Sequence, residues 1–149
     1  MELKTPNPLQ SENQELLADI KQASKLEGRT GKAAQLVARL LERHFAKEEE
    51  FALPPLGLLP ALAQGTIEQE MAAAITMAAK LHDGLPALLA EQRVIVAALE
   101  ELLAAAEREG HAELVGLAEQ LMLNAEIKQL VSYPTAILIG KYLQLRLKN

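Results

Sequence analysis

Residues 44–57, HFAKEEEFALPPLG, join a helical pattern to a double proline of the kind that ends a helix. His44 follows Leu40 and Leu41 by four and three residues, which places it on the apolar side of that helix. Glu48 lies four residues further on, and residues four apart share one side of a helix. The stretch therefore predicts a polar His–Glu pair facing a helical core, where buried polar groups need partners.

The composition favours helices along the whole chain. Hydrophobic residues make up 50% of the 149 residues but aromatic residues only 3%, and the apolar residues are mostly Leu and Ala, which are strong helix formers. The absence of cysteine excludes disulfides, zinc ribbons and thiol catalysis. A net charge of −5 without a basic cluster argues against nucleic-acid binding.

No part of the sequence predicts a membrane segment or a secretion signal. No apolar run reaches the roughly 18 residues that span a bilayer, and the first ten residues lack the apolar centre of a signal peptide. We therefore expect one cytoplasmic helical domain over residues 1–149, with no membrane partner.

Caps and helix breakers divide the chain into helices. Residues 1–10 are expected to be extended, and three helices are expected to start at the caps Ser11, Thr30 and Thr66 and to end near Gly28, Pro54 and Gly110. Asp83, Gly84 and Pro86 are expected to kink or split the third helix. A last helix is expected from His111 to about Ser132, with Pro134 opening a terminal helix.

These expected helices define an all-α fold. The segment LGLLPALAQG, residues 56–65, is expected to form a turn of helix over one end of the domain. The best match is an up-down four-helix bundle with a short connecting helix and a C-terminal helix.

Four phrases of the sequence resemble the bacterial hemerythrin-like proteins with an HHE cation-binding domain. They are PLQSENQELL, HFAKEEEFALPPLGLLPALAQG, LPALLAEQRVIVAALEELLAAA and LMLNAEIKQLVSYPTAILIGKYL, and they follow in order over nearly the whole chain. The resemblance implies a four-helix bundle whose core holds two bridged non-haem irons. Its ligand pattern is one His and then His-x-x-x-Glu, repeated once.

Most of the ligands implied by this resemblance are replaced. His44 and Glu48 are retained, whereas the other ligand positions carry Asn13, Leu17, Gln92, Asn124 and Lys128. Amides are weak, neutral ligands that suit hard ions better than iron, leucine cannot bind a metal, and lysine brings a positive charge. One His and one Glu cannot hold two irons, and zinc usually takes three or four protein ligands. We therefore expect that the di-iron site is lost and that the chain has no cofactor.

Two arrangements are open for Lys128. It can face Glu48 across the core and take over the electrostatic role of a metal, with the three amides hydrogen-bonded to His44 and to each other. Alternatively, its side chain can extend to solvent and never meet Glu48.

The remaining candidates favour surface or structural roles. His82 and His111 are expected on the surface, and Tyr133 with Pro134 matches the helix break of the family. The phrase GRTGK, residues 28–32, lacks the spacing of a phosphate loop.

Three functions follow from these observations. The first is a metal-free, non-enzymatic module for binding, scaffolding or regulation, whose ligands were lost naturally or removed by engineering. The second is an iron-binding protein for oxygen or iron sensing that recruits Glu12, Glu91 or Glu126. Because one residue turns a helix by about 100°, most of these carboxylates should miss the centre. The third is an iron-dependent peroxidase or oxidase, which would also lack enough ligands directed at the centre.

The C-terminal phrase YPTAILIGKYLQL, residues 133–145, is unusually apolar for a surface helix. It either packs over the other helices or offers a patch for a homodimer or another protein partner.

Overall fold

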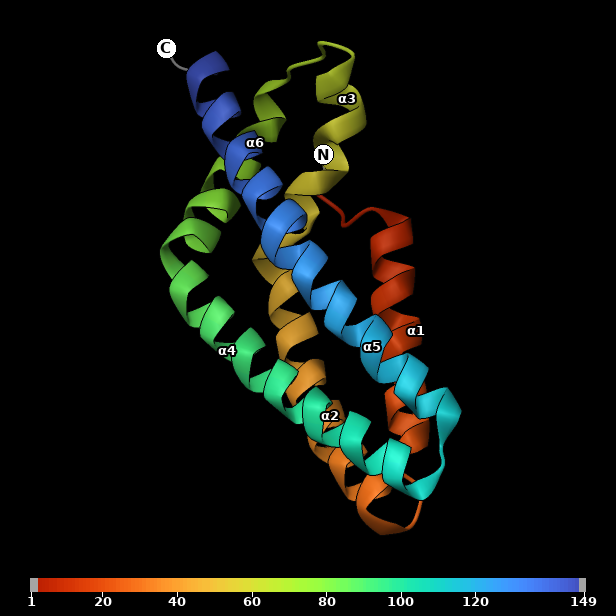
Figure 1. Cartoon of the computed structure of the whole chain (residues 1–149). Coiled ribbons are helices and arrows are strands. Elements are labelled where there is room, and N and C mark those ends of the chain that lie inside the picture. The colour runs from red at the N-terminus through yellow and green to blue at the C-terminus, as the bar shows by residue number, and fades with distance from the viewer. Residues whose placement is uncertain (1–2, 148–149) are drawn as a thin grey trace.

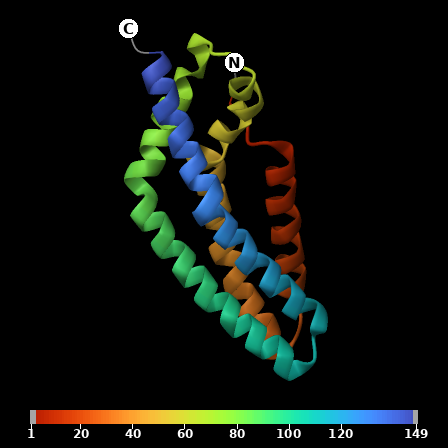
Figure 2. The same ribbon diagram turned by 45° about the horizontal axis from the view of Figure 1, so that its top comes forward.

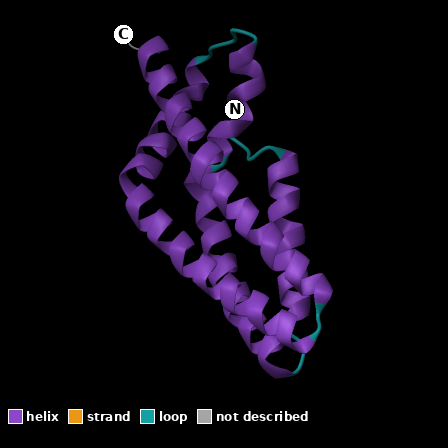
Figure 3. Cartoon of the chain, in the orientation of Figure 1, coloured by secondary structure: helices purple, strands orange, loops and turns teal. Residues whose placement is uncertain are grey.

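The computed structural model describes residues 3–147, and every regular element in that range is helical (Figure 3). The α-helices are α1 (Asn7–Ala23), α2 (Gly28–Lys47), α3 (Leu59–Ala63), α4 (Ala73–Glu109), α5 (Ala112–Ile127) and α6 (Tyr133–Arg146). Two π-helical turns, Glu48–Ala52 and Lys128–Ser132, and two 3-10 turns, Pro54–Leu58 and Gln69–Ala72, connect them. The predicted all-α class is confirmed. None of the helices in the described range combines the length and the apolar content needed to cross a bilayer.

The long helices lie side by side in an elongated molecule (Figures 1 and 2). α1 contacts α2 and α5, and α4 contacts α2, α5 and α6. α5, the π turn Lys128–Ser132 and α6 form one continuous column along the molecule. The α1–α2 and α4–α5 turns meet at one end of the molecule, and α3 and the C-terminal end of α6 both lie at the other end (Figure 1).

The expected caps at the starts of the first two helices, Ser11 and Thr30, are both wrong. α1 begins at Asn7, so residues 7–10 are helical and Ser11 is not its cap. Pro8 is tolerated in this first turn because its missing N–H would be unpaired there anyway.

The start of α2 is capped from a distant part of the chain. α2 begins at Gly28, so Thr30 lies inside it and does not cap it. The carboxylate of Glu109, at the end of α4, accepts hydrogen bonds from the backbone N–H groups of Arg29 and Thr30 at 3.2 and 3.0 Å. It also accepts one from the Thr30 hydroxyl at 2.5 Å. These bonds lower the pKa of the Glu109 carboxyl. The α1–α2 turn is thereby tied to the α4–α5 turn.

The third expected helix is one bowed element and is not split. α4 runs unbroken for 37 residues with Pro86 inside it, and Figure 1 shows its curvature. A proline removes one backbone hydrogen bond and bends a helix. The expected cap at Thr66 is wrong, because a 3-10 turn, Gln69–Ala72, leads into α4. Gly110 ends the helix as predicted, in the left-handed conformation with φ 81°.

The core consists of two aliphatic clusters. The lower cluster, near the α1–α2 and α4–α5 turns, includes Leu16, Ile20, Val37, Leu41, Ile95, Leu99, Leu102 and Leu121. The upper cluster, near α3 and α6, includes Leu53, Met71, Leu81, Leu88, Ile139 and Leu143. Buried polar residues lie between these two groups: His44 and Glu48 follow Leu41, and Gln92 lies between Leu88 and Ile95. A polar layer therefore separates the two clusters.

Candidate functional site

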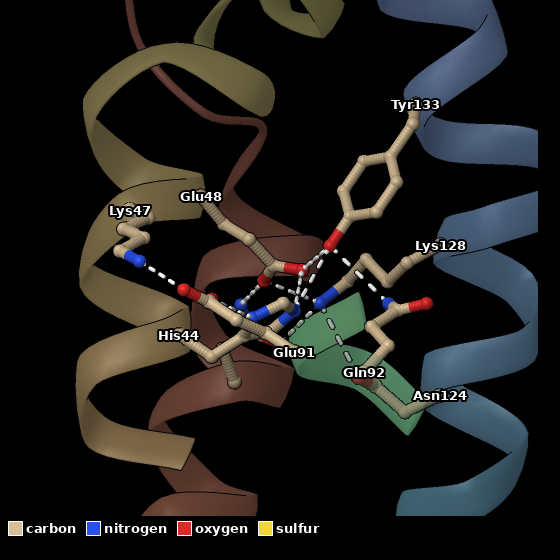
Figure 4. A network of polar contacts seen from close by, with 9 residues as sticks. His44, Lys47, Glu48, Glu91, Gln92, Asn124, Lys128 and Tyr133 are labelled. Carbon is tan, nitrogen blue, oxygen red and sulfur yellow. Dashed lines mark hydrogen bonds and ion pairs between the residues drawn. The ribbon is translucent and has the colours of Figure 1, made fainter. Parts of the chain in front are cut away.

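Six of the seven predicted site residues meet in this polar layer, and Figure 4 labels all of them except Asn13. They are Asn13 from α1, His44 from α2, Glu48 from the following π turn, Gln92 from α4, Asn124 from α5 and Lys128 from the second π turn. Each is at most 7% exposed. The seventh, Leu17, is partly buried against the lower aliphatic cluster. The helices therefore gather these polar positions, and Leu17 belongs to the apolar packing beside them.

Lys128 occupies the middle of the layer with its ammonium group fully paired. Its Nζ donates to Oε1 of Glu48 at 2.7 Å, to Oδ1 of Asn13 at 3.0 Å and to Oδ1 of Asn124 at 3.3 Å. An ammonium group has three donors, so all three are used. The Phe45 ring lies 4.9 Å from Nζ and adds a cation–π contact. The inward pair with Glu48 is confirmed, and the solvent-facing alternative for Lys128 is wrong.

The Glu48 carboxylate accepts hydrogen bonds from several residues of the polar layer. Its side chain is 0% exposed, and its Oε1 also accepts a hydrogen bond from Nδ2 of Asn13 at 3.1 Å. Its Oε2 accepts from the hydroxyl of Tyr133 and lies 3.7 Å from Nε2 of His44. A carboxylate withdrawn from water needs such compensation, because desolvating an unpaired charge is costly.

Tyr133 is a member of the layer that sequence reasoning missed. It is fully buried, and besides its bond to Glu48 its hydroxyl lies 3.2 Å from Nε2 of His44 and accepts from Nε2 of Gln92 at 3.3 Å. Burial, and then the charge of Glu48, raise the pKa of the phenol far above its ordinary value. The available signal was a tyrosine inside an aliphatic run, since the chain has only two tyrosines. A buried phenol usually finds a hydrogen-bond partner.

His44 connects the layer to the surface. Its Nδ1 lies 3.1 Å from Oε1 of Glu91, whose other oxygen pairs with Lys47. Burial raises the pKa of the Glu91 carboxyl, but the hydrogen bonds from Lys47 and His44 outweigh that effect and lower it. Both ring nitrogens of His44 thus face oxygen atoms, which fixes the orientation of the ring.

The carboxylates considered as recruited ligands lie at the edge of the layer or outside it. Glu91 meets His44, and Oε1 of Glu12 accepts from Nδ2 of Asn124 at 2.8 Å. Glu126 is exposed and lines the groove between α4 and α5. His82 and His111 lie outside the layer: the His82 side chain is 60% exposed and the His111 side chain 30%.

The residues of the layer do not fit a pair of irons. In the described part of the chain, no three His, Cys, Asp or Glu side chains come together in a way that could hold a metal ion. Oε1 of Glu48 accepts a hydrogen bond from the ammonium group of Lys128. Every fully buried nitrogen or oxygen of the layer's side chains has a hydrogen-bond partner. The donor set therefore suits an ammonium ion supplied by the chain itself.

Comparisons with known proteins return no match to any family model, curated protein or solved structure. The resemblance to hemerythrin-like proteins thus rests on the residue pattern alone.

Proposed function

We propose that this chain is a hemerythrin-like up-down four-helix bundle in which the Lys128 ammonium takes the place of the metal. We further propose that it is a metal-free, non-catalytic module for binding, scaffolding or regulation. The observation that carries this proposal is the contact of Lys128 Nζ with Glu48, Asn13 and Asn124. All four residues stand at positions that the resemblance assigns to metal ligands.

The arrangement of the long helices supports the bundle. α1 contacts α2 and α5, and α4 contacts α2 and both helices of the α5–α6 column. Short turns at one end join α1 to α2 and α4 to α5 (Figure 1). Up-down bundles place cofactor sites in the core from side chains of facing helices, which is where the polar layer lies.

The saturation of the polar layer supports a non-catalytic role. A catalytic acid, base or nucleophile must reach a substrate atom within hydrogen-bond distance. Here His44, Glu48 and Lys128 are at most 3% exposed, and their polar atoms bond to Asn13, Asn124, Tyr133 and one another, or to Glu91 in the case of Nδ1 of His44. Their polar atoms are used for internal structure, so we assign interaction functions to the surface of the bundle.

The direct test is the metal content of the chain purified without a histidine tag after growth with added iron. Far less than one equivalent of any transition metal per chain is expected, with no visible oxo-bridge absorption band. Two irons per chain with such a band would overturn the metal-free proposal and favour iron binding through recruited carboxylates.

A second test rebuilds the ligand pattern. The combined changes Asn13→His, Gln92→His, Asn124→His and Lys128→Glu restore the imidazoles and one carboxylate, and should create binding of iron or cobalt measurable by absorption and calorimetry. The matched control carries the three histidines but keeps Lys128, and it should bind far more weakly because the ammonium repels the cation. Equal binding by the two variants would argue against Lys128 as the metal substitute.

A further inference from the structure

α5, the second π turn and α6 form one C-terminal column (Figure 1). A strip of exposed apolar residues recurs along this column. Its members, here called the apolar strip, are Leu123, Ile127, Leu130, Val131, Pro134, Leu138, Tyr142 and Leu145. Apart from the adjacent Leu130 and Val131, they recur every three or four residues, which keeps side chains on one side of a helix. Buried residues such as Asn124, Lys128 and Ala136 alternate with them. The strip therefore faces away from the core.

The apolar strip is large for the surface of a monomer. Leu130, Leu138 and Leu145 are 64%, 65% and 75% exposed. At 1.5 Å per residue the strip is about 33 Å long from Leu123 to Leu145. With its flanking residues it offers on the order of 600 Å², the largest patch size usual on a monomer and the lower end of what each partner buries in a stable interface.

The charges beside the strip are separated by sign along the column. The charged residues of α5 are all acidic and exposed: Glu113, Glu119 and Glu126. Those of α6 are basic and exposed: Lys141 and Arg146. Lys128 lies between the two groups but is buried and paired with Glu48. The column thus has an acidic first half and a basic second half.

We propose that the apolar strip is the interface of a homodimer, in which a second copy of this chain packs antiparallel around a two-fold axis near Pro134. In that arrangement Leu123 faces the partner's Leu145, and Leu130 faces the partner's Leu138. The acidic half of each column then lies along the basic half of the other, and Glu126 approaches the partner's Lys141. A parallel pair would place like charges together, which is unfavourable.

Sedimentation velocity of the full chain tests the dimer. The expected mass is twice the 16.2 kDa of one chain. Leu138→Glu should raise the dissociation constant by roughly 100-fold or more, because each dimer loses two buried leucines. Leu36→Glu, at a 38% exposed leucine on α2, is the matched control and should leave the mass unchanged. Circular dichroism of both variants should match the wild type.

Two results would overturn the interface. One is a monomer at every concentration up to several hundred micromolar. The other is a dimer that Leu138→Glu leaves intact, since the contact would then lie elsewhere on the surface.

The orientation is tested with introduced cysteines, which is simple because the chain has none. Pro134→Cys, at the proposed axis, should form a disulfide-linked dimer on mild oxidation. Leu145→Cys should not, because its two copies would lie about 33 Å apart. An in-register parallel pair would place both Pro134 and Leu145 opposite their own copies, so crosslinking through Leu145→Cys would overturn the proposed antiparallel arrangement.

The charges give an independent readout of orientation. Glu126→Lys should raise the dissociation constant by roughly 2- to 10-fold, as expected for two exposed ion pairs. Adding Lys141→Glu to the same chain should restore it. Acidic residues early in a helix and basic residues late in it also suit the dipole of a single helix, without any dimer. If Lys141→Glu does not restore dimerisation of the Glu126→Lys variant, Glu126 and the partner's Lys141 are not in contact.

Discussion

The polar layer and the lower aliphatic cluster are built by the same helices, a few turns apart, and are held together in different ways. In the lower cluster, Leu99 and Leu102 are completely buried among other aliphatic side chains. In the polar layer, Glu48 is equally buried but has named partners at hydrogen-bond distance. Apolar burial is non-directional, whereas each bond of the layer requires a particular atom at a particular place.

This difference between apolar packing and directional bonds predicts which positions tolerate substitution. Aliphatic packing tolerates a different side chain of similar volume. The polar layer does not tolerate a side chain of similar shape but different charge. Neutralising Glu48 or Lys128 leaves the other charge buried and unpaired. Specific bonds within the layer also connect residues of α1, α2, α4 and α5 with Lys128 and Tyr133.

The strongest test of this contrast compares two nearly isosteric changes. Glu48→Gln should lower the free energy of unfolding by about 3–5 kcal/mol, because the Lys128 ammonium loses its carboxylate. Leu102→Met, in the lower cluster, keeps its volume and should cost less than about 1.5 kcal/mol. Urea denaturation measures both. Equal losses of unfolding free energy would mean that the polar layer tolerates a near-isosteric substitution as well as the aliphatic core does.

The second test asks whether the charges act as a pair. Lys128→Met and Glu48→Leu should each destabilise the chain, whereas the double variant should lose less than the sum of the two. The expected coupling is about 1–3 kcal/mol, measured by a double-mutant cycle. Additive losses would show that Glu48 and Lys128 are stabilised independently of each other.

Tyr133→Phe removes only an oxygen and should cost about 1–3 kcal/mol, because Gln92 and Glu48 each lose a buried partner. The raised pKa of the phenol adds a pH signature. Its stabilising effect is complete below the ordinary pKa of 10.0 and is lost as the pH rises above it. The wild type should therefore lose stability on the alkaline side, and Tyr133→Phe should lose less.

Tyrosinate absorption provides the control for that effect. In a Tyr142→Phe variant the only remaining tyrosine is Tyr133. No tyrosinate signal should then appear until the protein unfolds. A tyrosinate signal from the folded chain would mean that solvent reaches the Tyr133 phenol and that the polar layer is not sealed from water.

The smallest effect is expected at the edge of the layer. The pKa of Glu91 is lowered in the folded state, so its contribution is present above the ordinary value of 4.5 and is lost as the pH falls through the folded value. Glu91→Gln should make acid destabilisation below pH 4.5 less steep. Because its side chain is 34% exposed, the change at neutral pH should stay below about 1 kcal/mol. Thermal unfolding at several pH values measures it.

The polar layer was largely predictable, and the reason lies in helical spacing. His44 and Glu48 were assigned to the core because they continue the line of Leu40 and Leu41. Lys128 was placed opposite Glu48 through the resemblance, whereas Tyr133 was missed. Tyr133 lies five residues after Lys128, at the end of a π-helical turn. An α-helical period does not anticipate that turn, which brings both side chains to one centre.

The sequence by itself determined the helical class, the separation of apolar from polar sides and the end of α4 at Gly110. These features depend on local spacing and on backbone preference, which act over a few residues. Only the tertiary structure decided how α2 begins, since Glu109 caps it from about eighty residues away. It also decided that Lys128 turns inward, because a lysine stays buried only where facing helices supply the carboxylate and amide oxygens it needs.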